Sequence, residues 1–288
     1  MERKKLKKFA DILLDNPIFS MFCPNPDNHA PILYKYRNWK DEYHKNLLIK
    51  NELFLSPPSL LNDPFDTRIY ENYIEKLKTK EQKENYINES LKKNSKYFVE
   101  NKISIEEGRK ILEKRVEDSL YFQVRSEVLY NQIYDKSTGI ACLSENWNSI
   151  LMWSHYADNH RGYCIGFDEK WIRFCQKFGK VKRVEYSNIY PEPLETSKTS
   201  ELTFEQKYFH KSNDWKYEEE IRLVNIYNEE KPNRIEVLEN KYIKEVVLGL
   251  NTSEDDKEEI ISYAKHKKID VWETMKGDFE FKIERYKI

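Results

Sequence analysis

The stretch Gly139–Asp168, GIACLSENWNSILMWSHYADNHRGYCIGFD, is the most informative part of this chain. Residues 139–143 are typical of a strand, and a polar turn follows at 144–148. A short amphipathic helix is predicted from about Ser149 to Ala157, and a second strand from Tyr163 to Phe167. Binding groups concentrate on loops held by rigid elements, so this stretch is either a ligand-site wall or a packed core with aromatic anchors.

Several side chains of this stretch are candidates for contacting a ligand. Trp153 and Tyr156 are three residues apart and share a helix face, and His155 lies on a neighbouring face. One of these aromatic rings could stack on a nucleobase, although core packing is the commoner role for a tryptophan such as Trp153. The side chains that would face one region are Ser144, Trp153, His155, Tyr156 and Arg161.

The composition of the chain limits the classes of binding partner that can be expected. Charged residues make up 34% of the 288 residues but nearly cancel to a net charge of −1, so neither a nucleic acid nor a membrane is demanded as partner. Glycine is scarce, with only 7 residues, and neither GxGxxG nor GxxxxGK[ST] occurs. If a nucleotide binds, aromatic faces and side-chain donors must hold it.

Cysteines, histidines and the N-terminus favour a cytoplasmic protein. The four cysteines lack CxxC spacing, and the six histidines never pair at metal-ligand spacing, so neither a disulfide framework nor a metal site is predicted. The basic N-terminus predicts an exposed helix over about residues 1–15. Its apolar run is too short and interrupted for a secretion signal or a membrane span.

Strand-like segments flank a region rich in Lys, Glu and Asn. In that region, about residues 71–135, apolar side chains recur at helical spacing and predict two or three inserted helices. The strands are not separated by regular helices, which disfavours a doubly wound parallel sheet. We therefore expect residues 1–288 to form a single α+β domain with mixed, mainly antiparallel β-sheets and a helical insertion.

The segment Asp214–Val224, DWKYEEEIRLV, carries the strongest chemical signal. As a strand, it would place Glu218, Glu220 and Arg222 together on the face away from the core. One interpretation is a solvated edge strand protected by charge. The other is a glutamate that hydrogen-bonds a sugar hydroxyl, with Arg222 keeping it ionised. Two close glutamates would instead raise one pKa, as a general acid or base requires.

Two further segments carry candidate binding groups. In LYKYR, Lys35 and Arg37 share one strand face, where they clamp a pyrophosphate or carboxylate or else belong to an ordinary half-solvated strand. In SLLNDPFD, Asn62 and Asp63 either line a pocket or cap a turn, and turn capping is the favoured interpretation. Asp63 and Asp66 lack a third spaced ligand, so they are a weak metal signal.

These blocks, in this order, resemble a widespread bacterial family known as domain of unknown function 2971. The matching pieces are LYKYR at 33–37, LFLSPPSLLNDPFD at 53–66, GIACLSE at 139–145, ILMWSHYADNHRGYCIGFD at 150–168 and WKYEEEIR at 215–222. The resemblance runs from about residue 31 to beyond 222, and the family name carries no activity.

The order of a tyrosine-then-cation strand, a Ser/Trp/Tyr middle region and a late Glu-x-Glu strand also resembles the ADP-ribosyltransferase superfamily, including DNA-modifying members of toxin and phage-defence systems. The resemblance implies a split β-sandwich and NAD as co-substrate. It implies that Lys35 or Arg37 contacts the cofactor and that Ser144 or Tyr156 supports the nicotinamide ribose. It further implies that Glu220, with Glu218 upstream, binds the ribose 2′-hydroxyl.

This chain departs from the superfamily pattern in two places. Lys35 stands where histidine is usual, and there is no Ser-Thr-Ser tripeptide, so the roles of Lys35 against Arg37 and of Glu218 against Glu220 stay open. Glu218 and Glu220 are the predicted catalytic residues. The predicted cofactor-binding residues are Lys35, Tyr36, Arg37, Asn62, Asp63, Ser144, Trp153, His155, Tyr156 and Arg222.

The leading hypothesis is therefore an NAD-consuming glycosyl-transfer enzyme: an ADP-ribosyltransferase with a protein or nucleic-acid acceptor, or an NADase with water. Cleavage of the nicotinamide glycosidic bond passes through an oxocarbenium-like ribose, which a carboxylate on the 2′-hydroxyl stabilises. Two alternatives stay open. One is a non-catalytic module that senses a nucleotide or partner protein in a defence system. The other is a metal-dependent nuclease that uses Asp63, Asp66, Glu218 and Glu220.

Overall fold

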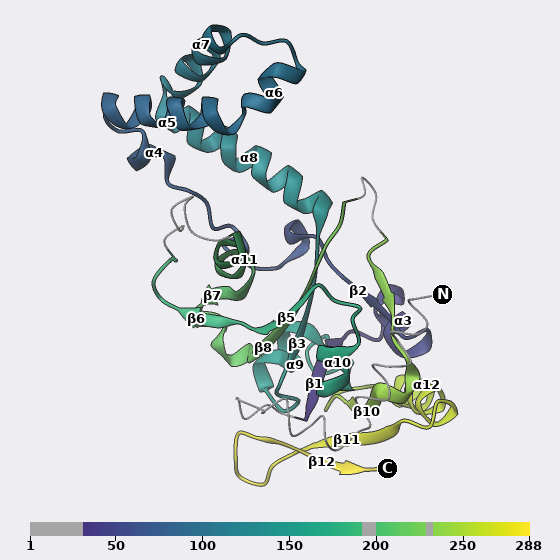
Figure 1. The fold of residues 1–288 in the computed structure, drawn as a ribbon. Helices are drawn as coiled ribbons and strands as arrows, with labels where there is room; N and C mark the ends of the chain where they lie inside the picture. The colour runs from purple at the N-terminus through teal and green to yellow at the C-terminus, as the bar shows by residue number, and fades with distance from the viewer. Residues whose placement is uncertain (1–30, 192–199, 229–232) are drawn as a thin grey trace, which may run out of the picture.

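The computed structural model describes residues 31–191, 200–228 and 233–288, so the helix predicted over about residues 1–15 lies outside the described residues. An eight-stranded sheet forms the centre of the fold (Figure 1). Within this sheet the β10–β11 pair is parallel and the other described pairs are antiparallel, which confirms the predicted mixed, mainly antiparallel α+β fold. In sheet order the strands are β12 (Ile283–Lys287), β11 (Asp270–Lys276), β10 (Ile243–Leu248), β4 (Tyr163–Asp168), β1 (Ile32–Arg37), β3 (Thr138–Ser144), β8 (Glu220–Ile226) and β5 (Lys180–Arg183).

Smaller elements surround the sheet. Two strand pairs stand apart from it: β2 (Glu52–Phe54) with β9 (Ile235–Val237), and β6 (Glu185–Ser187) with β7 (His210–Ser212). The surrounding α-helices are α3 (Glu42–Ile49), α9 (Ile150–Tyr156), α10 (Glu169–Phe174), α11 (Ser200–Phe209) and α12 (Glu254–His266). The short 3₁₀ helices are η1 (Pro58–Leu60), η2 (Asn213–Glu218) and η3 (Asn240–Tyr242).

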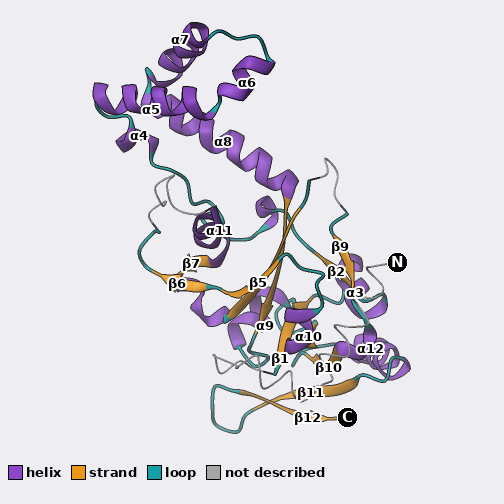
Figure 2. Cartoon of the chain, in the orientation of Figure 1, coloured by secondary structure: helices purple, strands orange, loops and turns teal. Residues whose placement is uncertain are grey.

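A helical segment projects away from the sheet (Figure 2). It has its own small apolar cluster, which includes Leu77, Ile87 and Leu112. Reciprocal capping by Thr79 and Gln82 begins one of its helices. Its helices are α4 (Tyr73–Lys76), α5 (Lys80–Lys93), α6 (Ser95–Glu100), α7 (Ile105–Val116) and α8 (Ser119–Ser137).

The two faces of β1 belong to different apolar clusters. Leu33 joins the main core, which the sheet forms with residues of α3, α10 and α12. Tyr34 and Tyr36 point the other way and pack with Trp153 of α9. This alternation places Lys35 on the same side as Leu33, as the two-residue period of a strand requires.

The pairing of β1 with β3 is nearly broken. The two strands are in register at a single pair, Tyr34 with Ser144. By contrast, β1 pairs with β4 along its whole length, and β3 pairs with β8 along its whole length. The eight strands therefore form one sheet that opens between β1 and β3, and this opening is where the candidate site lies.

The strand predicted from Asp214 begins only at Glu220, so the prediction was wrong for residues 214–219. Asn213–Glu218 forms η2, whose first turn is capped by Ser212, and Glu219 has a left-handed backbone with φ of 44°. Strand β8 lies between β3 and β5, and Glu220 is buried. The interpretation as a solvated edge strand is therefore also wrong.

We expect Gly162→Ala to destabilise the fold, because its new Cβ would overlap the carbonyl oxygen of Arg37 on β1. Backbone atoms cannot move aside cheaply, so about 1–3 kcal/mol of unfolding free energy should be lost. Urea denaturation measures this. Gly179→Ala is the control, since its nearest neighbour, the Val224 carbonyl oxygen, is 3.2 Å away. Equal unfolding midpoints for the two variants would contradict the expectation.

Candidate functional site

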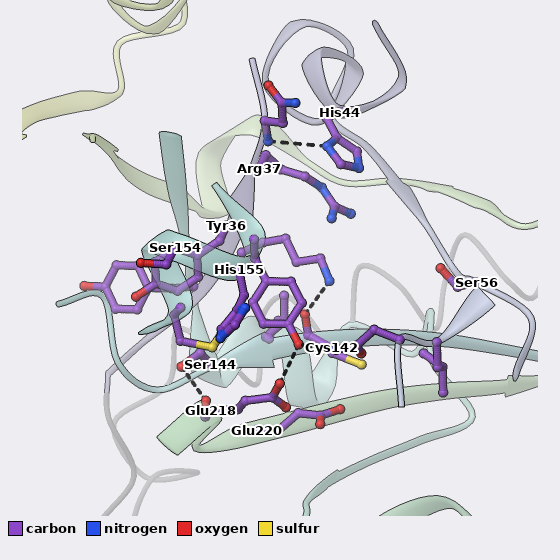
Figure 3. A pocket seen from close by; sticks show the side chains of 18 of the residues that line it. Tyr36, Arg37, His44, Ser56, Cys142, Ser144, Ser154, His155, Glu218 and Glu220 are labelled. Atoms are coloured by element: carbon purple, nitrogen blue, oxygen red, sulfur yellow. Dashed lines mark hydrogen bonds between the residues drawn. The ribbon is translucent and has the colours of Figure 1, made fainter. Parts of the chain in front are cut away.

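A cavity of about 520 Å³ lies where β1 and β3 separate (Figure 3). This volume is within the usual range for small-molecule sites. Segments far apart in the sequence meet here: β1, η1 and the residues after it, β3, α9, β7, η2 and β8. The predicted site residues that line it are Lys35, Tyr36, Arg37, Asn62, Ser144, His155, Tyr156, Glu218 and Glu220.

A buried network of charges forms one end of the cavity. The Arg222 guanidinium, which is fully buried, donates Nη1 and Nη2 to the two Asp66 oxygens at 2.9 Å each. Its Nε and Nη2 donate to Glu220 at 2.7 and 3.0 Å. Lys211 Nζ lies 3.3 Å from Glu220 Oε2 and 2.6 Å from Glu218 Oε2. These five side chains are called the Arg222 network below.

The pKa values of the two glutamates in the Arg222 network are shifted in opposite directions. Burial opposes ionisation of Glu220, but Arg222 and Lys211 overcome it and hold its pKa well below the usual value. Burial raises the pKa of Glu218, and the charge of Glu220 adds to the rise against the opposing effect of Lys211. Glu220 is therefore a fixed anion, whereas Glu218 is the carboxyl group whose protonation can change.

Glu218 is also the glutamate held by cavity residues. Its Oε1 accepts a hydrogen bond from the Tyr156 hydroxyl at 2.6 Å, and Asn62 Nδ2 donates to the same hydroxyl at 2.8 Å. The Ser144 hydroxyl donates to the backbone carbonyl of Glu218 at 2.6 Å. Three predicted binding residues thus fix the position of one carboxylate.

The other end of the cavity is basic. Lys35 Nζ donates to the Cys142 carbonyl oxygen at 2.7 Å, and the guanidinium of Arg37 has no hydrogen bond or ion pair with any described residue. Burial, reinforced by the charge of Arg37, lowers the pKa of Lys35 to about 8. Burial and Arg37 also lower the pKa of His44 to about 4, so this imidazole beside Arg37 is neutral (Figure 3). An anion would complete this end of the site.

Three predicted binding residues lie outside the cavity. The indole of Trp153 is fully buried and donates to the Trp147 carbonyl oxygen at 2.7 Å, so Trp153 is a core residue. Asp63 accepts the Phe65 backbone N–H at 2.9 Å and lines a neighbouring cavity, in agreement with turn capping. Arg222 lies behind the cavity wall, where it fixes the ionisation of Glu220 and cannot contact a ligand.

Lys211 and His44 line the cavity but were not predicted from the sequence as site residues. Lys211 sits on the three-residue strand β7, whose sequence HKS has no distinguishing pattern. His44 lies on α3, where its Nδ1 accepts the Asn38 backbone N–H at 3.3 Å. Asp66 was noticed only as a weak metal ligand, and its pairing with Arg222 depends on residues 156 positions apart.

The carboxylates offer no metal site in the part of the chain that the structure describes. No three or more His, Cys, Asp or Glu side chains there are placed to hold a metal ion. Asp66, Glu218 and Glu220 are each paired with Lys211 or Arg222, whose charges take the place of a cation.

Comparison with known proteins gives a partial match. Residues 152–223 match the model of a family described as "Protein of unknown function (DUF2971)", which supports the family resemblance over the region from α9 to β8. No curated protein and no solved structure matches the chain. None of the described helices is both long enough and apolar enough to cross a membrane.

Arg222→Met should destabilise the protein strongly, because it leaves the Asp66 and Glu220 carboxylates buried without their main partner. Breaking a buried ion pair from one side costs about 3–5 kcal/mol. Chemical denaturation followed by tryptophan fluorescence measures the loss. Lys110→Met removes a solvent-exposed pair with Glu106 and should leave the midpoint unchanged. An Arg222→Met midpoint close to that of the control would contradict the structural role of Arg222.

Lys35 should acylate at lower pH than exposed lysines. With a pKa of about 8, its amine is protonated and unreactive below that pH and becomes nucleophilic as pH rises through it. Exposed lysines reach the same point only near about 10.4. Pulse labelling with acetic anhydride, read by peptide mass spectrometry, gives the midpoint. Arg37→Gln removes the neighbouring positive charge and should shift the Lys35 midpoint upward; an unchanged, lysine-like profile in both proteins would refute the assignment.

Proposed function

We propose that this chain is an NAD-consuming glycosyl-transfer enzyme, which passes ADP-ribose to an acceptor or hydrolyses NAD. The observation that carries the proposal is the charge arrangement of one cavity: Arg37 of β1 lies at one end and Glu218 and Glu220 at the other (Figure 3), and the Lys35 amine is held on the Cys142 carbonyl oxygen. NAD has an anionic pyrophosphate and a nicotinamide ribose that becomes cationic as its glycosidic bond breaks. The two ends of the cavity match these two charges.

The basic end is suited to the pyrophosphate. Arg37 has no anionic partner among the described residues, and its planar guanidinium can bind a phosphate through two N–H groups. Lys35, whose pKa of about 8 leaves it mostly protonated at pH 7, adds a second positive charge, and a bound anion would raise that pKa further. His44, being neutral, can donate a hydrogen bond without adding to the charge already present.

The contacts favour Glu218 over Glu220 as the carboxylate that acts on the ribose. Both Glu220 oxygens accept hydrogen bonds from Arg222, while Glu218 is held by Tyr156 and Lys211 beside the cavity. A Glu218 carboxylate hydrogen-bonded to the 2′-hydroxyl would strengthen its interaction as positive charge develops on the sugar. Nicotinamide leaves with the bonding electrons, and the acceptor, a protein, a nucleic acid or water, adds to the same carbon.

The nicotinamide would be placed by aromatic side chains. Tyr36 and Tyr156 line the cavity, and the ring of His155 lies 6.1 Å from that of Tyr217 and 6.2 Å from that of Tyr156. Offset stacking on such rings is favourable and does not require a glycine-rich loop. The scarcity of glycine in this chain is therefore compatible with NAD as co-substrate.

The proposal is tested by incubating the protein with NAD, alone and with protein, DNA or RNA acceptors, and measuring free nicotinamide. Glu218→Gln keeps the size of the side chain but removes its charge, and we expect kcat to fall by about 10²–10³-fold with folding intact. Glu219→Gln is the matched control, because this neighbouring glutamate is exposed and outside the cavity. Arg37→Gln should mainly raise KM.

Two outcomes would count against the enzyme. Nicotinamide release that is unaffected by Glu218→Gln would remove Glu218 from the mechanism. NAD binding, seen by calorimetry, without turnover in any acceptor mixture would leave a nucleotide-sensing module in place of an enzyme. Absence of both binding and turnover would refute NAD as the ligand.

A further inference from the structure

Lys207 of α11 is buried without a counter-ion. Only 6% of its surface is exposed, and it has no hydrogen bond or ion pair with any residue that the structure describes. Its Nζ instead faces aromatic rings, with the centroid of Tyr134 at 2.9 Å, that of Tyr130 at 4.6 Å and that of Tyr208 at 5.7 Å. Tyr130 and Tyr134 belong to α8, so α11 and the helical segment meet at this amine.

The amine lines a second cavity, of about 770 Å³, which shares no lining residue with the first. It lies between α11 and the helical segment, with walls from α5 and α8. Tyrosine dominates its lining, and its charged side chains besides Lys207 are Glu71, Glu89, Lys93 and Glu127. Three carboxylates against two amines make this cavity unsuited to an anionic ligand.

Burial favours the uncharged form of the Lys207 amine, whose nitrogen keeps a free lone pair. Desolvation lowers the pKa of this side chain to about 6; the positive charge of Arg68 adds to the decrease, and Asp135 opposes it. A lysine that is neutral at pH 7 and lies in a cavity is a nucleophile, since only the unprotonated amine can attack a carbonyl carbon.

We propose that Lys207 is a nucleophilic amine in a second ligand site, which takes small uncharged aldehydes or ketones with a planar apolar body. The Nζ lone pair forms a bond to the carbonyl carbon as the carbon–oxygen π bond breaks. The oxygen then leaves as water with the two protons of the amine, and an imine remains. The reaction is balanced without an oxidant or reductant, and the tyrosine rings stack on the planar body.

If Lys207 has only a structural role, its amine should not react with aldehydes in the native protein. If Lys207 serves only to join α11 to α8 through its contact with the Tyr134 ring, the amine stays enclosed and unreactive in the native protein. Trapping in the folded chain therefore separates the two roles.

The experiment treats the native full-length protein with benzaldehyde and sodium cyanoborohydride at pH 6.5 and maps benzylated lysines by mass spectrometry. We expect Lys207 to be modified at least about tenfold faster than the exposed Lys40 and Lys110, because their amines are protonated at this pH. The anionic 4-carboxybenzaldehyde should react more slowly at Lys207 than benzaldehyde does. Lys207→Met should lose the fast phase and keep the labelling of exposed lysines.

The proposal is overturned if Lys207 reacts no faster than Lys40 and Lys110 in the native protein. Labelling in urea provides the second measurement, because unfolding removes the burial and should abolish the preference for Lys207. This comparison uses only the natural chain, so it holds even where Lys207→Met folds poorly. Fast labelling that persists unchanged in urea would also refute a site made by the fold.

Discussion

The buried guanidinium of Arg222 is the interaction on which the candidate site depends. Each of its N–H groups has an acceptor: both oxygens of Asp66, both oxygens of Glu220 and the Tyr208 carbonyl. Ion pairs out of contact with water lose much hydration energy, and only complete hydrogen bonding compensates for the loss. Because its partners come from the loop after η1, from α11 and from β8, this one side chain fixes three segments around the cavity.

That arrangement separates charge across the cavity. At one end, Arg222 and Lys211 hold Glu220 as an anion, and burial together with the charge of Glu220 raises the pKa of the neighbouring Glu218. Arg37 lies at the other end, and Lys35 is held on the Cys142 carbonyl oxygen, where the charges of Arg37 and of the two glutamates all affect its pKa. The folded protein maintains this field before any ligand enters, which is the electrostatic basis of the proposed NAD chemistry. The cavity lies at the opening between β1 and β3.

Local patterns in the sequence were sufficient for the elements that depend on local forces. The alternation in residues 32–37 and 139–143 predicted β1 and β3, and helical spacing predicted a helical segment that the structure places at 73–137. Predicting η2 required more. Alternation alone favours a strand over residues 214–219. In the structure Glu218 accepts a hydrogen bond from Lys211 and so belongs to the Arg222 network. The left-handed backbone of Glu219 then separates η2 from β8.

Side-chain environments were harder to predict than elements. Three lysines show this. Lys207 faces tyrosine rings, Lys211 bridges two glutamates, and Lys110 is exposed on the surface, although all three are the same residue type. These differences come from contacts between segments far apart in the chain, which no local period encodes. Trp153 illustrates the converse, since its burial follows from the apolar face of α9, and it does not line the cavity.

The junction between α8 and β3 has a mechanical consequence. Helix α8 ends at Ser137 and β3 begins at Thr138, so no flexible linker separates them. Its 19 residues make a rod of roughly 28 Å. Because no loop lies between them to absorb a movement, a rotation of this rod would also turn the strand that carries Cys142 and Ser144.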